Sequence, residues 1–520
     1  MRRIRRLGYL FSRWLIKAIV RPRLAGAPPA FADLPEEARP QIIYALENRS
    51  LSDLIVLDIL SEKLGLPNPL EPVLLGPHEE ERRVFFLNRA SYGWFRRNTM
   101  SRPSERMVRI LENARHAPEA ALLPVAIFWG RAPSRHRSIL RSLVAEDWAV
   151  ATRLKRLLNM VISRKEIFVH YGNLLPLRTL ADPELDDKRM TRRAARLLRV
   201  QLRNQRVATI GPDFSHQRTL VDQILRSRKV VDAIEAQSGE QTVRKLERQA
   251  RKAAMSIVSN MSYPTIRVLE RLLTWFWNKI YGGIEIRGLE RVMKLAETHT
   301  PIYTPSHRSH VDYLLLSYLL HAHGLMIPHI AAGDNMNLPI VGALLRRGGA
   351  FFMRRSFRDD PIYTAVFSEY LYQVYRRGHC VEFFPEGGRT RTGRLLPARL
   401  GLLKMTLEHN ARGAPRPLAL VPVYFGYEKL IEAGSYLEEL RGSKKEKESV
   451  GDVFRSLRLI RQNFGTVNVG FGVPIQLDEW CAARKEVPAG DQPRELGREV
   501  LQRINQTASV NPINLVALVT

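Results

Sequence analysis

The stretch TPSHRSHVD, residues 304–312, contains the residues on which the chemistry of this chain depends. The residues PIY at 301–303 precede it and the apolar YLLL follows it, a pattern that predicts a strand end, a polar turn and a helix to about Leu320. His307 precedes Asp312 by five residues, so the two side chains meet only if the chain turns between them. Histidine takes a proton near neutral pH, and a carboxylate on its far nitrogen fixes the tautomer. The stretch therefore predicts a general base, His307, oriented by Asp312.

Both residues also have a purely structural interpretation. Ser309 is a good N-cap, and Asp312 three residues later completes a capping box before the apolar run. Asp312 could thus serve only the helix, and a lone loop histidine is usually just hydrogen-bonded. Residues further along the chain favour the catalytic interpretation.

The composition points to a multidomain protein with an anionic partner. A length of 520 residues predicts two or more domains, and a hydrophobic content of 45% is ample for a core. The net charge of +29 predicts either nucleic acid or an anionic membrane surface as partner. Two cysteines, Cys380 and Cys481, indicate a reducing compartment without a disulfide framework or zinc cluster. No uninterrupted apolar run reaches the roughly 18–20 residues that span a bilayer.

The first segment, residues 1–39, predicts a basic amphipathic helix followed by a Pro/Ala-rich linker. Arg13 and Lys17 interrupt its apolar run, which lacks the features of a signal peptide. Tyr9, Phe11 and Trp14 lie on or near one face, as in helices that lie in the membrane interface. The alternative is a helix docked on a core.

Residues 40–180 resemble residues 285–480 of the same chain. Without gaps, 42–57 align with 301–316, which places Asn48 on His307. The same alignment places Tyr44, Arg49, Ser50 and Asp53 on Tyr303, Arg308, Ser309 and Asp312. Three further short matches follow in the same order: 84–89 with 350–355, 123–125 with 421–423, and 168–172 with 468–472. We therefore expect 40–180 to be a degenerate copy of the later domain, catalytically silent because it lacks the histidine.

Residues 181–284 have a different character. Arg- and Lys-rich amphipathic patterns predict helices over 181–275, which form either a solvated face or a surface for anionic lipid or an acidic carrier protein. The cluster LLTWFWNKIY at 272–281 fits a core, but aromatic residues flanked by Arg and Lys favour contact with the bilayer interface.

From residue 285 onward, short apolar strands alternate with helices. Strands are predicted at 302–304, 329–331, 350–353, 380–384, 418–424 and 467–471. This alternation predicts an α/β fold with a partly parallel sheet flanked by helices on both faces, over a domain at 285–480. Functional loops gather at the strand ends of such sheets. Residues 481–520 form a C-terminal segment.

Two loops in this domain predict anion binding. Arg354 and Arg355 follow one strand, and PEGGRTRTG at 385–393 follows the next. Two glycines permit close backbone approach, with N–H groups facing an anion, and arginines contact phosphate bidentately. Together with the His/Asp pair, these loops predict a phosphorylated small substrate beside a general base.

These blocks resemble the four sequence blocks of the glycerolipid acyltransferases. The four are H-x4-D at 307–312, GAFFMRR at 349–355, FPEGGR at 384–389 and VPV at 421–423. Residues 306–320, 329–333 and 427–449, with FWGRAP at 128–133, are similar to the bacterial membrane-associated glycerol-3-phosphate acyltransferases in particular. The resemblance covers about 40 to 515. Members of that family usually continue further, so we expect a fragment or a short form.

The resemblance implies transfer of a fatty acyl group from acyl-CoA or acyl-acyl-carrier-protein to the 1-hydroxyl of glycerol 3-phosphate, the first step of phospholipid synthesis. It implies peripheral attachment to the cytoplasmic face of the bacterial inner membrane and no cofactor or metal. The resemblance implies eight substrate-binding residues: Arg354, Arg355, Glu386, Gly387, Gly388, Arg389, Arg391 and Pro422. Among these, Glu386 is implied as a positioning residue and Pro422 as part of the floor of the site. The implied oxyanion donors are backbone N–H groups of Gly387 or Gly388, or of the His307 turn.

Three alternatives stand beside this interpretation. A lysophosphatidate acyltransferase would use the same fold and mechanism. A metallohydrolase could use His307, His310 and Asp312, but its usual spacing needs histidines where Arg308 and Tyr313 stand. A nucleic-acid-binding protein would explain the charge, but no zinc-finger spacing, RNP-like strand or convincing recognition helix occurs.

Overall fold

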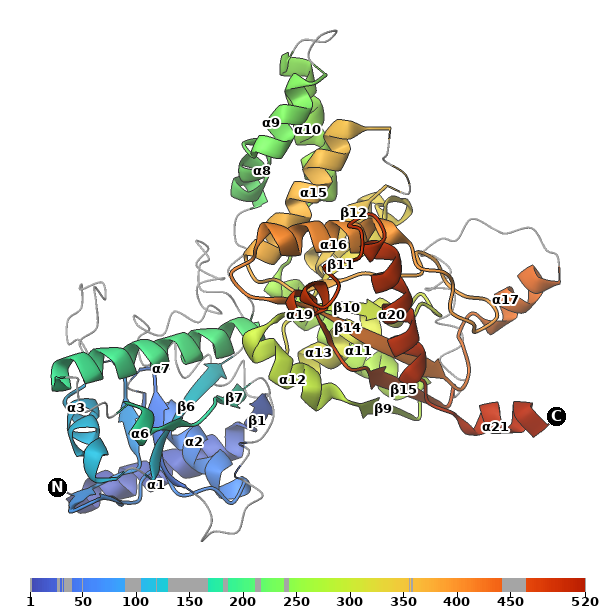
Figure 1. Cartoon of the computed structure of the whole chain (residues 1–520). Coiled ribbons are helices and arrows are strands. Elements are labelled where there is room, and N and C mark those ends of the chain that lie inside the picture. The colour runs from blue at the N-terminus through green and yellow to red at the C-terminus, as the bar shows by residue number, and fades with distance from the viewer. Residues whose placement is uncertain are drawn as a thin grey trace. The chain divides into compact units, whose positions relative to one another are not determined.

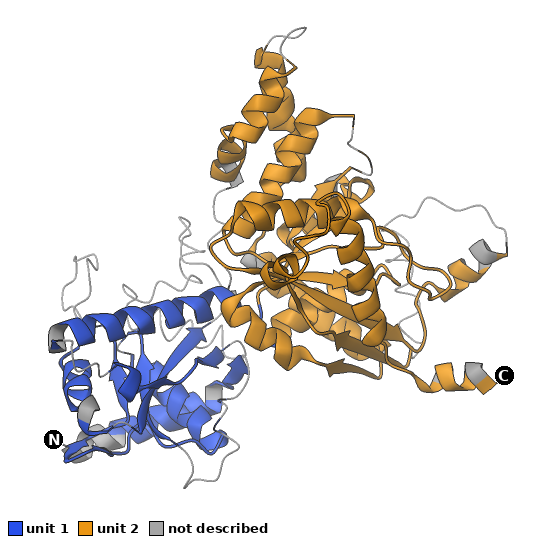
Figure 2. Cartoon of the chain, viewed as in Figure 1, with its two compact units in different colours: residues 1–210, 323–325 blue, residues 211–322, 326–520 orange. Residues whose placement is uncertain are grey.

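A computed structural model describes most of the chain. The described residues are 2–25, 29, 31, 40–48, 50–88, 104–117, 119–129, 167–180, 186–210, 217–237, 243–354, 356, 359–441 and 464–519. The chain divides into two compact units, shown in Figure 2, each described by itself below. Unit 1 comprises Met1–Ile210 and His323–Leu325, and unit 2 comprises Gly211–Ala322 and Met326–Thr520.

Unit 1 is built on a mixed sheet of six strands. The strand order is β1 (Arg23–Ala25), β7 (Ile167–Tyr171), β6 (Ala120–Trp129), β2 (Gln41–Leu46) and β5 (Val84–Phe86). β8 (Leu175–Pro176) also pairs with β6, and β3 (Val73–Leu75) and β4 (His78–Glu80) form a separate hairpin. β2 is parallel to β5 and β6, whereas β7 is antiparallel to β6.

Helices cover both faces of this sheet. They are α1 (Arg2–Ile19), α2 (Leu51–Lys63), α3 (Glu105–Glu112), α6 (Leu177–Leu180) and α7 (Asp187–Ile210), with the 3-10 helix η2 (Asn113–His116). Alternate residues of β2 point to opposite faces: Ile42, Tyr44 and Leu46 pack with α1 and α2, while Ile43 and Ala45 pack with α3 and α7. Burial on both faces explains why β2 is a nearly continuous apolar run.

Unit 2 contains the larger sheet, with eight strands. The strand order is β12 (Ala350–Met353), β11 (His329–Gly333), β13 (Val381–Glu382), β10 (Thr300–Pro305), β14 (Leu418–Tyr427), β15 (Thr466–Phe471) and β9 (Gly283–Arg287), and β16 (Ile475–Gln476) also pairs with β14. The strands from β12 to β14 are all parallel, β15 runs antiparallel to β14, and β9 runs parallel to β15. The predicted α/β fold with a mixed sheet is confirmed.

Helices flank this sheet too (Figure 1). They are α8 (Gln217–Leu225), α9 (Arg228–Glu235), α10 (Val243–Ile257), α11 (Tyr263–Ile280), α12 (Leu289–Thr298), α13 (Asp312–Ala322), α14 (Pro339–Arg347), α15 (Pro361–Arg376), α16 (Leu400–Arg412), α17 (Ala433–Leu440), α19 (Leu477–Ala482), α20 (Gln492–Gln506) and α21 (Pro512–Val519), with η3 (Asp334–Met336). Residues of α15, α16 and α20 form one core with β10, β13 and β14, and α8 to α10 extend that core along α15. No helix among the described residues is long and apolar enough to cross a membrane.

The two sheets share a strand order and a register. The path β1-β7-β6-β2-β5 matches β9-β15-β14-β10-β13. Tyr44 lies opposite Leu123 as Tyr303 lies opposite Val421. Val125 pairs with Tyr171 as Val423 pairs with Phe471. The antiparallel pairing of β8 with β6 likewise repeats that of β16 with β14: Ala121 lies opposite Pro176 as Ala419 lies opposite Gln476.

One of the four predicted sequence matches is wrong. The predicted match is 84–89 with 350–355, but in the structure residues 84–88 align with 382–386, because Val84 pairs with Tyr44 as Glu382 pairs with Tyr303. Between β2 and β5, unit 1 has the hairpin β3–β4 where unit 2 has β11 and β12. Short matches could not reveal this difference in strand number.

Candidate active site

His307 and Asp312 meet where β10 ends and α13 begins. The Nδ1 atom of His307 lies 3.0 Å from Oδ2 of Asp312, because the chain turns through residues 306–311. The histidine side chain is 18% exposed and the carboxylate is fully buried. With Nδ1 directed at the carboxylate, Nε2 is the ring atom left for a substrate.

Asp312 has four hydrogen-bond donors. Besides His307, its Oδ2 atom accepts from the backbone N–H groups of Arg308 at 2.7 Å and Ser309 at 2.9 Å. Its Oδ1 atom accepts from the Tyr427 hydroxyl at 2.6 Å. Burial and the nearby carboxylate raise the pKa of Tyr427 well above its ordinary value, which keeps this hydroxyl a donor. The structural and catalytic interpretations of Asp312 are therefore compatible, since it caps the turn and holds the histidine.

Glu386 fixes the same turn from the other side. Its Oε1 atom accepts from His307 N at 2.8 Å, and its Oε2 atom accepts from Leu396 N at 2.8 Å. Burial raises the pKa of this carboxyl group. The resemblance implies that Glu386 is a positioning residue, and in the structure its partners are the backbone N–H groups of His307 and Leu396. The ring of Phe384 stacks on His307 with 3.9 Å between centroids, which limits the ring's tilt.

The glycine loop reaches the turn, and its two glycines differ. Gly387 has φ +64°, and a Cβ there would lie 2.6 Å from Arg399 Cγ, so glycine is required. Its N–H donates to Phe384 O, so this donor is occupied. The N–H groups of the His307 turn are occupied as well, by Glu386, Asp312 and Glu432. The N–H of Gly388 has no hydrogen-bond partner within the described part of the chain.

The predicted arginines lie at different distances from the histidine. Arg389 is nearly buried, donates to the Tyr436 hydroxyl at 2.7 Å and lies 3.9 Å from a Glu432 oxygen. Arg391 donates to Arg389 O at 2.8 Å, and Thr390 N donates to His307 O, so this loop is adjacent to the turn.

Arg354 is further away. It lies at the end of β12, which is three strands away from β10 in the sheet, so the two strands are about 14 Å apart. Its side chain donates to Asp360 at 2.9 Å. Arg355 lies outside the described residues. Pro422 is buried in β14 opposite Thr304, and its carbonyl accepts from Gly472 N at 2.8 Å.

Sequence reasoning missed three residues that support the turn. Glu432 accepts from Ser309 Oγ at 2.9 Å and His310 N at 2.8 Å, and burial raises its pKa. Tyr436 donates to Arg308 O at 3.0 Å. Tyr427 is the third. A signal for it existed: an aromatic residue stands five positions after the central proline of VPV at 421–423 and after the proline of the matching 123–125.

No group of three or more His, Cys, Asp or Glu side chains among the described residues is arranged to hold a metal ion. His310, a ligand in the metallohydrolase alternative, uses its backbone N–H to contact Glu432.

Unit 1 retains part of this arrangement at the matching positions. Trp129 Nε1 donates to Asp53 Oδ1 at 2.6 Å, as Tyr427 donates to Asp312. Asn48 replaces the histidine, and its Oδ1 atom accepts from Asn88 Nδ2 at 3.0 Å. By register, Asn88 stands where Glu386 stands in unit 2.

Comparisons with known proteins cover most of the chain. Residues 8–211 match the Glycerol-3-phosphate acyltransferase PlsB N-terminal domain, residues 283–426 the Acyltransferase family, and residues 436–520 the Glycerol-3-phosphate acyltransferase C-terminal region. A crystal structure of the 1-acyl-sn-glycerophosphate (LPA) acyltransferase from Thermotoga maritima aligns with 61% of this chain and all of its own, at 15% identity and a TM-score of 0.29.

Curated relatives extend the match. The glycerol-3-phosphate acyltransferase of Ectopseudomonas mendocina is 42% identical over 99% of this chain and 64% of its own length. That of Pseudomonas putida KT2440 is 45% identical over 93% of this chain and 60% of its own length. The chain thus spans about three fifths of the length of these relatives. With three matched regions in order and this identity, the predicted resemblance to the glycerol-3-phosphate acyltransferases is confirmed over most of the chain.

Proposed function

We propose that unit 2 transfers a fatty acyl group from an acyl thioester to the 1-hydroxyl of glycerol 3-phosphate, giving lysophosphatidate. The observation that carries the proposal is the His307–Asp312 pair at the end of β10, with Nε2 free for a substrate beside the Arg389 loop. The names of the curated relatives support the acceptor.

The reaction needs no enzyme nucleophile. His307 Nε2 takes the hydroxyl proton as the glycerol oxygen attacks the thioester carbonyl, and Asp312 stabilises the imidazolium that forms. The tetrahedral intermediate then expels the thiolate, which receives the proton from His307. General base catalysis of this kind contributes on the order of 10²–10⁴-fold.

The Gly388 N–H is the donor we assign to the developing oxyanion, since Gly387 and the turn amides are already bonded. Arg389 and Arg391 bind the substrate phosphate, with Arg354 and Arg355 as further contacts. Arginine suits this role because its planar group pairs bidentately with phosphate. Pro422 forms part of the floor. The donor is acyl-CoA or acyl-acyl-carrier-protein, and neither a metal nor a cofactor takes part.

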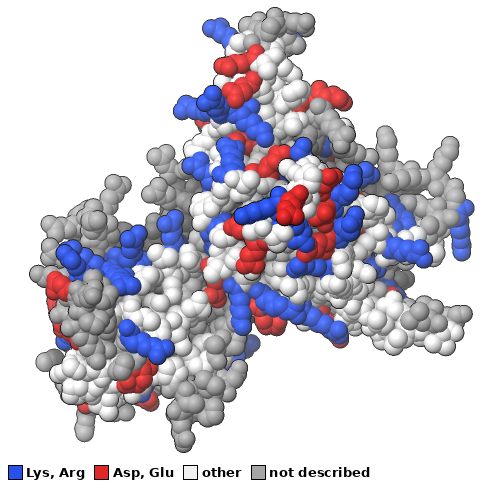
Figure 3. All heavy atoms as spheres, in the orientation of Figure 1, with Lys and Arg blue, Asp and Glu red and all other residues white. Residues whose placement is uncertain are grey.

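The proposal includes peripheral attachment to the cytoplasmic face of the inner membrane, and two amphipathic helices support attachment to a membrane surface. In α1, Ile16 is buried and Arg13 pairs with Asp58 at 2.7 Å, while Phe11 and Trp14 are 63% and 65% exposed. In α11, Trp277 is buried, while Val268, Leu272 and Trp275 are exposed. Each helix thus packs on its own unit by one face and presents apolar side chains on another. In the view of Figure 3, Lys and Arg side chains lie on each unit among Asp and Glu side chains, and the net charge of +29 suits anionic lipid.

Unit 1 is, in this proposal, a degenerate and catalytically silent copy of the acyltransferase domain. Its strand order and register support the copy, and Asn48 in place of His307 supports the silence, since an amide cannot take a proton at neutral pH. A single acyl-transfer site in unit 2 follows.

The test is acyl transfer from palmitoyl-CoA to radiolabelled glycerol 3-phosphate in reconstituted membranes. Wild type should give labelled lysophosphatidate and His307→Ala none. A wild type that acylates lysophosphatidate but not glycerol 3-phosphate would identify the alternative acyltransferase and overturn the substrate assignment.

A further inference from the structure

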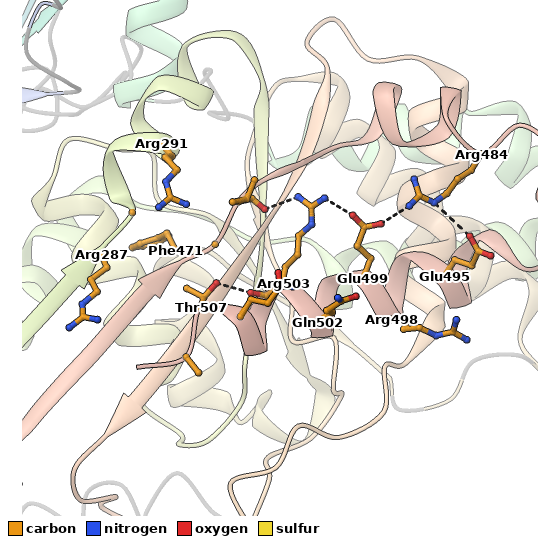
Figure 4. A pocket seen from close by; sticks show the side chains of 15 residues that line it. Arg287, Arg291, Phe471, Arg484, Glu495, Arg498, Glu499, Gln502, Arg503 and Thr507 are labelled. Atoms are coloured by element: carbon orange, nitrogen blue, oxygen red, sulfur yellow. Dashed lines mark hydrogen bonds and ion pairs between the residues drawn. The ribbon is translucent and has the colours of Figure 1, made fainter. Parts of the chain in front are cut away.

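A basic pocket of about 910 Å³ opens in unit 2 at the end of β15, between the start of α12 and the length of α20 (Figure 4). None of the residues assigned to acyl transfer above lines it. We propose that this pocket binds a small molecule carrying two or more phosphate groups. The proposal does not depend on acyl transfer, because it concerns binding alone.

The lining carries more positive than negative charge. Five arginines line the pocket, against two glutamates: Arg287, Arg291, Arg484, Arg498 and Arg503 against Glu495 and Glu499. The glutamates already have partners. Arg484 lies 3.0 Å from Glu499 and 3.7 Å from Glu495, and Arg503 lies 2.5 Å from Glu499. Arg503 also donates to the carbonyls of Val473 and Pro474.

The remaining three arginines are available to a ligand. Arg287 lies 3.8 Å from Glu285, a contact between exposed groups that contributes little. Arg291 and Arg498 form no ion pair within the part of the chain that the structure describes. Figure 4 shows Arg484, Glu499 and Arg503 linked in a row, while no dashed line reaches Arg287, Arg291 or Arg498. Several cations gathered in one hollow repel one another, and a bound anion relieves that repulsion.

The pocket walls are held by packing. Gly288 has φ +75°, and a Cβ there would collide with the carbonyl of Phe471, so glycine allows the start of α12 to lie against β15. On the other wall, Val500 and Ile504 anchor α20 in the core, and Trp480 Nε1 donates to Glu499 at 2.6 Å. Arg287, Arg291 and Arg498 therefore project from a strand and two helices that packing holds in place, as a binding site requires.

Chemistry and size indicate the ligand class. Guanidinium groups favour phosphate oxygens, and Gln502 and Gln506 add neutral donors to the lining. A volume of about 910 Å³ is far larger than one phosphate needs and is in the range of small-molecule sites. Phe471, at the edge of the pocket, pairs with Val423, and Val423 pairs with Pro305 in the strand that leads to His307. Two strand spacings, about 10 Å, therefore separate the pocket edge from that strand. Both the phosphorylated end of coenzyme A and a free di- or polyphosphate fit this description.

The experiment is calorimetric titration of the full chain with two probes, inorganic pyrophosphate and coenzyme A. Arg291→Ala and Arg498→Ala should each weaken binding roughly ten-fold, and the double variant about a hundred-fold, because each removes one charged contact to phosphate. Arg498→Lys should weaken binding less than Arg498→Ala, because lysine keeps the charge but lacks the planar guanidinium group. Arg494→Ala, on the same helix but outside the pocket lining, is the matched control and should bind as wild type. Raising the salt concentration should weaken binding of both probes.

Each outcome decides the proposal. If both probes bind, compete with each other and fail to bind the double variant, the proposal is supported and coenzyme A of the acyl donor is the ligand. Binding of pyrophosphate alone, lost in the same variant, supports it with a free polyphosphate as the source. Binding of neither probe at millimolar concentration, or binding that Arg291→Ala and Arg498→Ala leave unchanged, overturns it.

Discussion

The carboxylate at the start of α13 and its counterpart near the start of α2 make one contact in common and differ in another. Asp312 and Asp53 each accept a hydrogen bond from an aromatic side chain, of Tyr427 and Trp129 respectively, at 2.6 Å. Asp312 also holds a histidine, whereas the matching position of unit 1 is Asn48. The shared contact ties a helix start to the sheet and serves the fold in both units. The histidine belongs to unit 2, so the comparison separates what the fold needs from what the chemistry needs.

The largest difference between the two units is expected when His307 and its counterpart Asn48 are replaced in turn. His307→Ala should lower kcat by on the order of 10²–10⁴-fold, since it removes the proposed general base. Asn48→Ala should leave kcat within about two-fold, because it deletes only a hydrogen bond between exposed side chains. Steady-state acyl-transfer assays measure both. Residual activity in His307→Ala that Asn48→Ala abolishes would show that unit 1 is not silent.

The two aspartates should respond almost as differently. Asp312→Asn should lower kcat by on the order of 10²–10³-fold, since an amide neither fixes the histidine tautomer nor stabilises the imidazolium. Asp53→Asn should leave kcat unchanged and cost about 1–2 kcal/mol in the free energy of unfolding, because Trp129 still finds an acceptor, though an uncharged one. Activity and urea unfolding, measured on the same preparations, test the pair. A loss of kcat in Asp53→Asn would contradict it.

Glu382 and Val84, which occupy the same register position in β13 and β5, differ in charge. Glu382 is fully buried, and neither carboxylate oxygen has a hydrogen-bond partner within the described part of the chain. Burial, with the nearby Asp312 charge, raises the pKa of Glu382 well above its ordinary value. When the pKa of a group is higher in the folded protein than in the unfolded chain, its contribution to stability is fully present below the pKa of the unfolded chain. That contribution is lost as the pH rises through the pKa of the folded protein.

A variant without the Glu382 carboxyl group should therefore become more stable than wild type as pH rises above about 4.5. The difference in the free energy of unfolding should grow by up to about 1.4 kcal/mol per pH unit until the pKa of Glu382 in the folded protein is reached. Glu382→Gln removes the titration at nearly constant shape, and Glu382→Val introduces the unit 1 residue. Urea unfolding at several values between pH 5 and pH 8 measures the slope. A pH dependence as steep in Glu382→Gln as in wild type would show that another group is responsible.

The smallest expected effects concern the aromatic donors. Tyr427→Phe removes one of the four donors to Asp312 and should lower kcat about ten-fold or less while costing about 1–3 kcal/mol in stability. Trp129→Phe should cost a similar amount in stability with no change in kcat. The same assays apply. Equal losses of kcat in both variants would mean that the donors act on catalysis through the fold alone.

The sequence predicted the elements that depend on local pattern. Apolar runs located six of the eight strands of unit 2, all but β9 and β16, and the turn at 304–312 placed His307 next to Asp312. What it could not predict depends on long-range backbone contacts. Glu386 accepts from two N–H groups, and backbone amides carry no sequence signature. Glu432 reaches the turn from more than 100 residues away.

Two errors have different physical origins. The match of 84–89 with 350–355 relied on shared letters, whereas strand position depends on how many strands lie between two elements, which short matches do not encode. The strand predicted at 380–384 is only Val381–Glu382, because Pro385 lacks an N–H for the ladder and the chain turns there into the glycine loop.

The occupied amides of the His307 turn have a further consequence for how the proposed acyl-transfer activity is lost on heating. Because the N–H groups of Arg308 and Ser309 point at a buried carboxylate, their hydrogens can exchange with deuterium only when that carboxylate is released. Release also frees the imidazole and the start of α13. The geometry around His307 should thus persist until this whole segment opens, so warming should abolish turnover in a single cooperative step without a preceding gradual decline.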